Sequence, residues 1–192
     1  MATNLVTRTE YKTYAGISST NSDAEIDQLI TQVSELVKTY CRRTFVDNLD
    51  DAKVENFSGG GFYTYYLKEY PIVQVSSVEY SSDYGQTYTA LTQYTDWVYD
   101  PSITAIRSLA VTGFTDVING YRVTYTCGYE NGIPADLKVA ILDLISYYRR
   151  NDSAIHSTKV ISPNTMQVEY VSSSAFPAHI KRVLDMYMAD YT

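Results

Sequence analysis

The sequence has few of the residues on which most enzymes and metal proteins rely. Its 192 residues include two cysteines, two histidines and one tryptophan. Cys41 and Cys127 lie far apart at no metal-ligand spacing, and two thiols cannot build a disulfide framework. His156 and His179 each lack a flanking motif that would join them to a nucleophile and a carboxylate. We therefore expect no catalytic site, no metal site and no cofactor.

Long apolar runs are also absent. No stretch approaches the roughly 18 residues needed to cross a bilayer. The opening segment MATNLVTRTEYKTY lacks the apolar region of a signal peptide. We expect no association with a membrane. Hydrophobic residues still make up 45% of the chain and aromatic residues 14%, which is enough for a core and argues against disorder.

Basic residues are outnumbered, with 15 Lys and Arg against 22 Asp and Glu. Residues 46–133 hold four basic and 11 acidic side chains, so the whole net charge of -7 belongs to this segment. Affinity for phosphate depends on Lys and Arg, which argues against a dedicated nucleic-acid binder. The same segment holds 12 of the 20 tyrosines. Their rings could form a stacking platform for single strands or sugars, or an ordinary protein interface.

Two long helices are predicted from apolar residues at three-and-four spacing. The first spans Asp23 to Arg43 after a predicted capping box at Ser22–Glu25, and the second runs from Pro134 to about Asn151. Residues 8–14 predict a short helix ending at Gly16. A last helix begins at Pro177, with an apolar stripe that continues to Tyr191.

Arginine pairs mark the ends of both long helices. Arg42 and Arg43 close the first helix, and Arg149 and Arg150 close the second. Compensation of the helix dipole explains all four.

Between the long helices the apolar period changes to two, which predicts strands. Gly59–Gly61 and Asp83–Gly85 mark turns, and Pro71 separates two strands. No Lys-Ser or Lys-Thr follows Gly59–Gly61, so we expect a flexible hairpin loop there and no phosphate loop. MQVEYV, at 166–171, predicts a further short strand. The predicted strands of the middle segment are FYTYYL, IVQVSSVEY, TYTAL, DWVYD and RVTYTCGY.

This order predicts an α+β fold. Residues 1–45 and 134–192 would form a small helical bundle, and residues 46–133 an antiparallel β segment inserted between the two long helices.

Three segments carry a resemblance to a known family. They are DAEIDQLITQVSELVKTYCRRTF, LKEYPIVQVSSVEY followed by DYGQTY, and YRVTYTCGYENGIPADLKVAILDLISYYRR. Their order and wording resemble the head-tail connector, or head-completion adaptor, family of tailed bacteriophages, in its longer form with a β insertion. FPAHIKRVLDMYM is similar to the closing helix of that family. The resemblance spans about residues 10–190.

The resemblance implies a structural protein with no enzymatic activity. In this family the protein forms a homo-oligomeric ring of twelve subunits. The ring docks under the portal protein and extends the DNA channel toward a stopper or tail-terminator protein. It implies a place in the neck of the virion, after assembly in the cytoplasm of the bacterial host. An acidic segment facing the lumen would repel phosphate, so genomic DNA would pass without specific binding.

The resemblance also implies that the terminal segment, residues 176–192, docks on the portal. A helix at a chain end, tethered by the polar stretch 151–165, can order on binding, and Met and Tyr suit adaptable contacts. The expected docking residues are Lys181, Met186, Tyr187, Met188 and Tyr191.

Two alternatives stay open. The inner half of the last helix could pack on the other helices through Ile180, Val183, Leu184 and Tyr187. The chain could also be a Tyr-rich protein- or sugar-binding module of another virion or surface assembly. An enzyme ranks third, after the connector family and the binding module, because no site residues converge.

Replacing both histidines should leave function intact, because neither belongs to a site motif. We expect phage that carry His156→Ala and His179→Ala to keep their titre in an infectivity assay. A complete loss of titre from a folded double variant would reveal a site that these motifs do not show.

Overall fold

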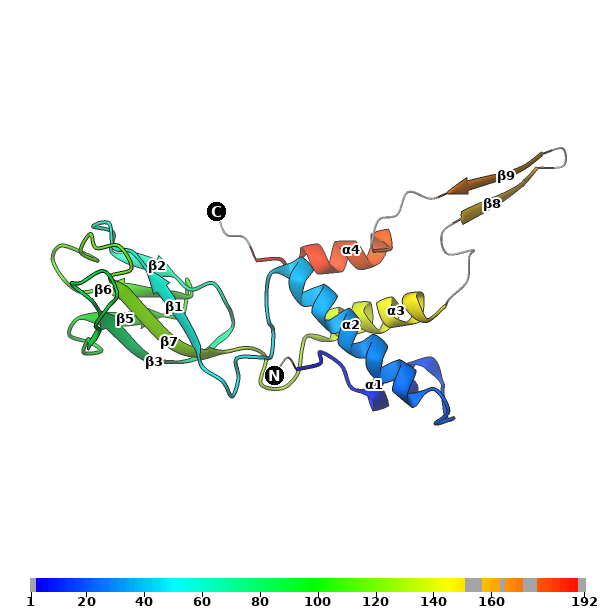
Figure 1. Ribbon diagram of the computed structural model, residues 1–192, viewed down its shortest axis with the longest axis horizontal. Helices are drawn as coiled ribbons and strands as arrows, with labels where there is room; N and C mark the ends of the chain where they lie inside the picture. The colour runs from blue at the N-terminus through cyan, green and yellow to red at the C-terminus, as the bar shows by residue number, and fades with distance from the viewer. Residues whose placement is uncertain (1–2, 151–156, 163–164, 171–175, 190–192) are drawn as a thin grey trace. The chain divides into compact units, whose positions relative to one another are not determined.

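The computed structural model describes residues 3–150, 157–162, 165–170 and 176–189. The chain divides into two compact units (Figure 1). One, the β unit, contains Thr44–Gly132, and the other, the helical unit, is formed by Ala2–Arg43 and Ile133–Met188. The β unit is inserted between the second and third helices, so the predicted α+β class is confirmed. That the units are separate domains stays a prediction.

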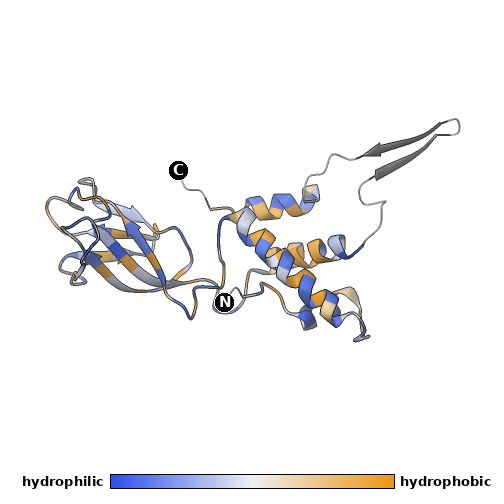
Figure 2. Cartoon of the chain, in the orientation of Figure 1, coloured by the Kyte–Doolittle hydropathy of each residue, from blue (hydrophilic) through white to orange (hydrophobic). Residues whose placement is uncertain are grey.

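The helical unit contains four helices whose apolar stripes face one another. They are α1 (Arg8–Ala15), α2 (Asp23–Cys41), α3 (Ala135–Arg149) and α4 (Ala178–Asp185). The second helix contacts the other three, and α3 also contacts α1 and α4. Figure 2 shows apolar and polar bands alternating along α2 and α3, as an amphipathic helix requires. The buried apolar residues of these two helices include Ile26, Ile30, Val33, Val37, Leu137, Ile141, Leu144 and Ile145.

The helix ends differ from the predictions. The capping box predicted at Ser22 is wrong: Ser22 has φ -108° and ψ 15°, not the extended backbone that aims a capping hydroxyl at the helix, and it makes no side-chain cap. A capping box occurs instead at Thr7 and Glu10, where Thr7 is extended. The second helix ends at Cys41, before the predicted end at Arg43, and α4 ends at Asp185, before the end of its apolar stripe at Tyr191.

The β unit consists of two antiparallel sheets that share one core. The order is β1-β7-β3-β4 in the first sheet and β2-β6-β5 in the second. Buried side chains from both sheets meet in that core, including Phe57, Val78, Trp97, Ile106 and Tyr121. The strands are β1 (Lys53–Phe57), β2 (Thr64–Tyr66), β3 (Ile72–Tyr80), β4 (Thr89–Ala90), β5 (Trp97–Asp100), β6 (Ala105–Ser108) and β7 (Tyr121–Cys127).

Two strands of the β unit, β1 and β6, were not predicted. The prediction of a hairpin loop at Gly59–Gly61 is wrong. The strands on either side of these glycines, β1 and β2, belong to different sheets. The Gly59 amide donates to the Val117 carbonyl, and a Cβ on Gly59 would lie 1.7 Å from the Thr115 carbonyl oxygen. The glycines therefore allow a close backbone approach between two loops, which no local pattern reveals.

A separate pair of strands follows α3. These are β8 (Ser157–Ser162) and β9 (Thr165–Tyr170), which pair antiparallel. The predicted strand MQVEYV is confirmed as far as Tyr170, and Val171 lies outside the described residues.

Leu144→Asp should unfold the helical unit. Leu144 is fully buried on the inner face of α3, so the substitution removes apolar contacts and buries an unpaired charge. We expect a loss of more than about 4 kcal/mol in the free energy of unfolding, measured by chemical denaturation. Val139→Asp is the matched control, because Val139 is 48% exposed on the same helix. A Leu144→Asp variant as stable as this control would contradict the core assignment.

Candidate docking site

The last helix, α4, packs with its inner face on the other helices of the helical unit. Ile180 and Leu184 are buried, and α4 contacts both α2 and α3. Just before the helix, the buried ring of Phe176 meets the ring of Tyr40 edge-on, with 4.7 Å between centroids. The alternative that the inner half of the helix packs on the other helices is therefore confirmed for these two α4 residues.

The residues after α4 divide into anchored and exposed side chains. Tyr187 is anchored, because its hydroxyl donates to Asp136 at 2.6 Å and its carbonyl oxygen accepts from the buried guanidinium of Arg43 at 3.3 Å. Met186 and Met188 are 74% and 43% exposed. Arg43, predicted only to compensate a helix dipole, thus holds this segment as well.

Of the five predicted docking residues, the structure brings four to one short segment. Met186 and Met188 present apolar side chains to solvent, and Lys181 lies on the exposed side of α4. Tyr187 lies between the methionines but is turned back onto α3. Tyr191 lies outside the described residues.

An acidic side chain ties the end of α4 to α2. Asp185 accepts a hydrogen bond of 2.5 Å from Tyr40 and forms an ion pair of 3.1 Å with Lys181. The Tyr40 bond, followed by the Lys181 bond, lowers the pKa of Asp185 below its usual value. The same bond raises the pKa of Tyr40. Both groups therefore keep the protonation state that the contact needs at neutral pH.

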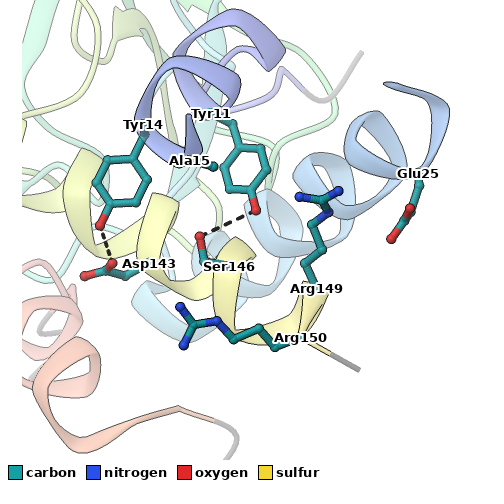
Figure 3. Close-up of a pocket in the computed structure, with 8 residues that line it drawn as sticks. All are labelled: Tyr11, Tyr14, Ala15, Glu25, Asp143, Ser146, Arg149 and Arg150. Atoms are coloured by element: carbon teal, nitrogen blue, oxygen red, sulfur yellow. Dashed lines mark hydrogen bonds between the residues drawn. The ribbon is translucent and has the colours of Figure 1, made fainter. Parts of the chain in front are cut away.

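The helical unit also contains an open pocket of about 730 Å³. Figure 3 shows the lining residues, in which the Tyr14 hydroxyl binds Asp143 and the Tyr11 hydroxyl meets Ser146 at 3.5 Å. Arg149 and Arg150 border the pocket from the end of α3. The full lining is Tyr11, Tyr14, Ala15, Glu25, Asp143, Ser146, Arg149 and Arg150.

Two acidic residues of the β unit are buried, which composition did not reveal. Glu55 accepts a hydrogen bond of 2.5 Å from Tyr125, and Glu69 lies 3.2 Å from the Lys53 amine. Glu69 also accepts from the Thr44 amide at 3.3 Å. Burial, and then the hydrogen bond to Glu55, raise the pKa of Tyr125. These two of the 11 acidic side chains are thus taken up inside the unit.

The tyrosines of the β unit divide in the same way. Tyr121 and Tyr125 are buried in the core, and Tyr65, Tyr80 and Tyr99 pack against it. The ring of Tyr65 stacks on Phe57 with 3.7 Å between centroids. Much of the aromatic enrichment therefore builds the core, where rings supply large apolar area.

The described residues show no reactive centre. Cys41 and Cys127 are buried and unpaired, and desolvation raises the pKa of each thiol to about 12, so neither is a thiolate at neutral pH. His179 is exposed on α4, and His156 lies outside the described residues. Within the described ranges, no three His, Cys, Asp or Glu residues gather in a way that could hold a metal ion. None of the helices described is both long and apolar enough to span a bilayer.

The sequence matches the family model of the head completion protein over residues 4–189. The chain belongs to the head completion protein family. The predicted resemblance is confirmed, and the family is structural and non-enzymatic, which confirms the prediction of no enzyme. No curated protein matches the sequence.

Solved structures with the same fold come from neck proteins of gene transfer agent particles. This head completion protein is similar to a chain in the neck of an empty particle computed with C6 symmetry, with a TM-score of 0.63 and 12% identity over 98% of this chain and 91% of that one. A chain in the neck of a native particle computed with C12 symmetry gives a TM-score of 0.60 and 12% identity, over 100% and 97%. At this identity the likeness shows the fold.

Tyr40→Phe should raise the pKa of Asp185 toward the value of about 3.9 for a free side chain, because it removes the largest cause of the lowered pKa. A group with a lowered pKa in the folded state adds stability above its unfolded pKa and loses it as pH falls through the folded pKa. The variant should therefore lose more stability at pH 7 than at pH 2.

A carboxyl titration by NMR measures this pKa directly. Asp136 is the internal control, because its pKa is lowered by the Tyr187 hydrogen bond and does not involve Tyr40. An unchanged Asp185 pKa in the variant would contradict the contact.

Proposed function

We propose that this head completion protein forms a ring, twelvefold as in its family, beneath the portal of a phage-like particle, where it extends the DNA channel and joins the head to a stopper or tail-terminator protein. The observation that carries this proposal is the family match over residues 4–189, together with a fold shared with chains in particle necks that were computed with C6 and C12 symmetry. The protein acts in the virion neck after assembly in the host cytoplasm.

The charge of the β unit supports a place along the channel. Its segment has seven more acidic than basic side chains, and only Glu55 and Glu69 among the acids are buried. Surface acid that faces the lumen repels the phosphates of genomic DNA, so the duplex moves through without binding.

Portal docking is assigned to Lys181, Met186, Tyr187, Met188 and Tyr191. Met186 and Met188 are exposed beside a backbone that Arg43 and Asp136 hold through Tyr187. Methionine side chains adapt to irregular apolar surfaces, and an anchored backbone limits the entropy that they lose on binding.

Electron microscopy of the purified protein added to DNA-filled heads that bear the portal tests the ring. We expect density for a closed ring under the portal. Heads that leave the added chain in the supernatant would contradict the proposal.

The docking segment is tested by Met186→Ser combined with Met188→Ser. Both side chains are exposed, so the fold and melting temperature should be unchanged, whereas portal binding should weaken at least about tenfold, since a buried methionine contributes about 1.5–3 kcal/mol. Binding to purified portal is measured by interferometry. Val139→Ser, an exposed apolar site on α3, is the matched control.

Deletion of residues 186–192 complements this variant, because it also removes Tyr187 and Tyr191. A deletion variant that binds portal as tightly as the full chain would place the docking surface elsewhere, most plausibly on the β unit.

A further inference from the structure

Two adjacent arginines, Arg149 and Arg150, lie at the end of α3. Arg149 is half-buried and Arg150 is exposed, and both border the pocket of Figure 3. Neither guanidinium makes a hydrogen bond or an ion pair with any residue that the structure describes. Guanidinium groups bind carboxylates through parallel N–H donors, so two of them side by side suit an acidic partner.

The other polar groups of the pocket do not meet this need. The carboxylate of Asp143 is already bound by the Tyr14 hydroxyl, and Tyr11 is paired with Ser146. Glu25 is exposed in the first turn of α2, where a negative charge suits the positive helix end, and it forms no ion pair with either arginine. The pocket therefore has a positive edge at the end of α3, and its own hydroxyl groups are already hydrogen-bonded to other lining residues.

The β unit carries a pair of adjacent acids. Asp50 and Asp51 are adjacent and exposed, and within the described part of the chain neither is bonded to a basic side chain. They lie in the segment that holds the whole excess of acid, whereas residues 1–45 and 134–192 are balanced in charge. The turn that contains them is held in place, because the Cys127 amide donates to the Asn48 carbonyl at 2.9 Å.

We propose that Arg149 and Arg150 bind the Asp50–Asp51 turn of a second copy of this chain. The pocket and the turn are different surfaces, so the contact is head-to-tail, and a head-to-tail contact repeated by rotation closes into a ring. The proposal rests on the ring proposed above and names a contact between its subunits.

Charge reversal tests the contact on DNA-filled heads that bear the portal. Arg149→Glu with Arg150→Glu should place like charges at the contact, and so should Asp50→Lys with Asp51→Lys. Each variant alone should lower the amount of head-bound chain at least tenfold. An equimolar mixture should restore it to within twofold of the natural chain, because every contact in an alternating ring then joins opposite charges.

Matched controls carry the same charge changes elsewhere. Lys68→Glu with Arg107→Glu, and Asp116→Lys with Glu130→Lys, should assemble like the natural chain. If the arginine and aspartate variants also assemble normally, this contact is wrong and the ring proposal stands. If the natural chain itself fails to bind heads, the proposed function is wrong, and the contact is then decided by the second measurement.

Disulfide trapping is that second measurement and uses the chain alone at high concentration. Arg150→Cys and Asp51→Cys, in separate chains, should form a mixed dimer under oxidation, with little background because Cys41 and Cys127 are buried. Neither variant should form it when incubated alone. Absence of the mixed dimer overturns the proposal. So does an internal disulfide in a chain that carries both substitutions, because the acid would then come from the same chain.

Discussion

The β unit can interrupt the helical unit only because its two ends are paired with each other. The first strand, β1, runs antiparallel to the last, β7, with Lys53 opposite Tyr125 and Phe57 opposite Tyr121. Beyond the strands, the Tyr129 amide donates to the Phe45 carbonyl at 3.0 Å. The chain therefore leaves the helical unit at Thr44 and re-enters it after Gly132 at neighbouring points. As a result, α2 and α3 can pack against each other as consecutive helices would.

A buried carboxylate of the β unit also lies at these paired ends. Glu69 binds the Thr44 amide and the Lys53 amine, so it joins the first residue of the unit to β1. Buried ion pairs contribute little net stability when complete, but removal of one partner leaves an uncompensated charge at a cost of about 3–5 kcal/mol. An arrangement of the chain that separated Glu69 from Lys53 would therefore be less stable. A Cβ on Gly128 would lie 2.5 Å from the Phe45 carbonyl oxygen, which adds a steric constraint at the same place.

A structural protein such as a head completion protein needs surfaces for its partners and a stable fold. Its thiols are buried and protonated, and its apolar residues build two cores. The surface of the described residues presents exposed methionines after α4, two arginines at the end of α3 and acidic side chains on the β unit. The fold is shared at 12% identity because apolar periodicity and core volume tolerate extensive substitution, whereas contact surfaces change with their partners.

The sequence by itself determined the elements whose signal is local. The apolar stripes of α2 and α3, the bounds of β3 at Ile72–Tyr80 and the start of α3 after Pro134 follow from periodicity and from the fixed backbone of proline, and the structure confirms them. The segments quoted for the family were of the same kind. They sufficed for the α+β class and for the family because both depend on the order of such elements.

Only the tertiary structure decided features that depend on partners distant in the sequence. Ser22 does not cap α2, because its backbone conformation, and not its residue type, decides whether the hydroxyl can reach the helix. Gly59 is required by the Thr115 backbone, 56 positions away, and Glu69 is buried because Lys53 and Thr44 meet it there. Arg43 and Arg149 both lie at the C-terminal ends of long helices, yet Arg43 is buried and bonded to Tyr187, whereas Arg149 borders an open pocket. Residue type determines which groups a side chain can bind, and packing determines which of those groups lies close enough to be bound.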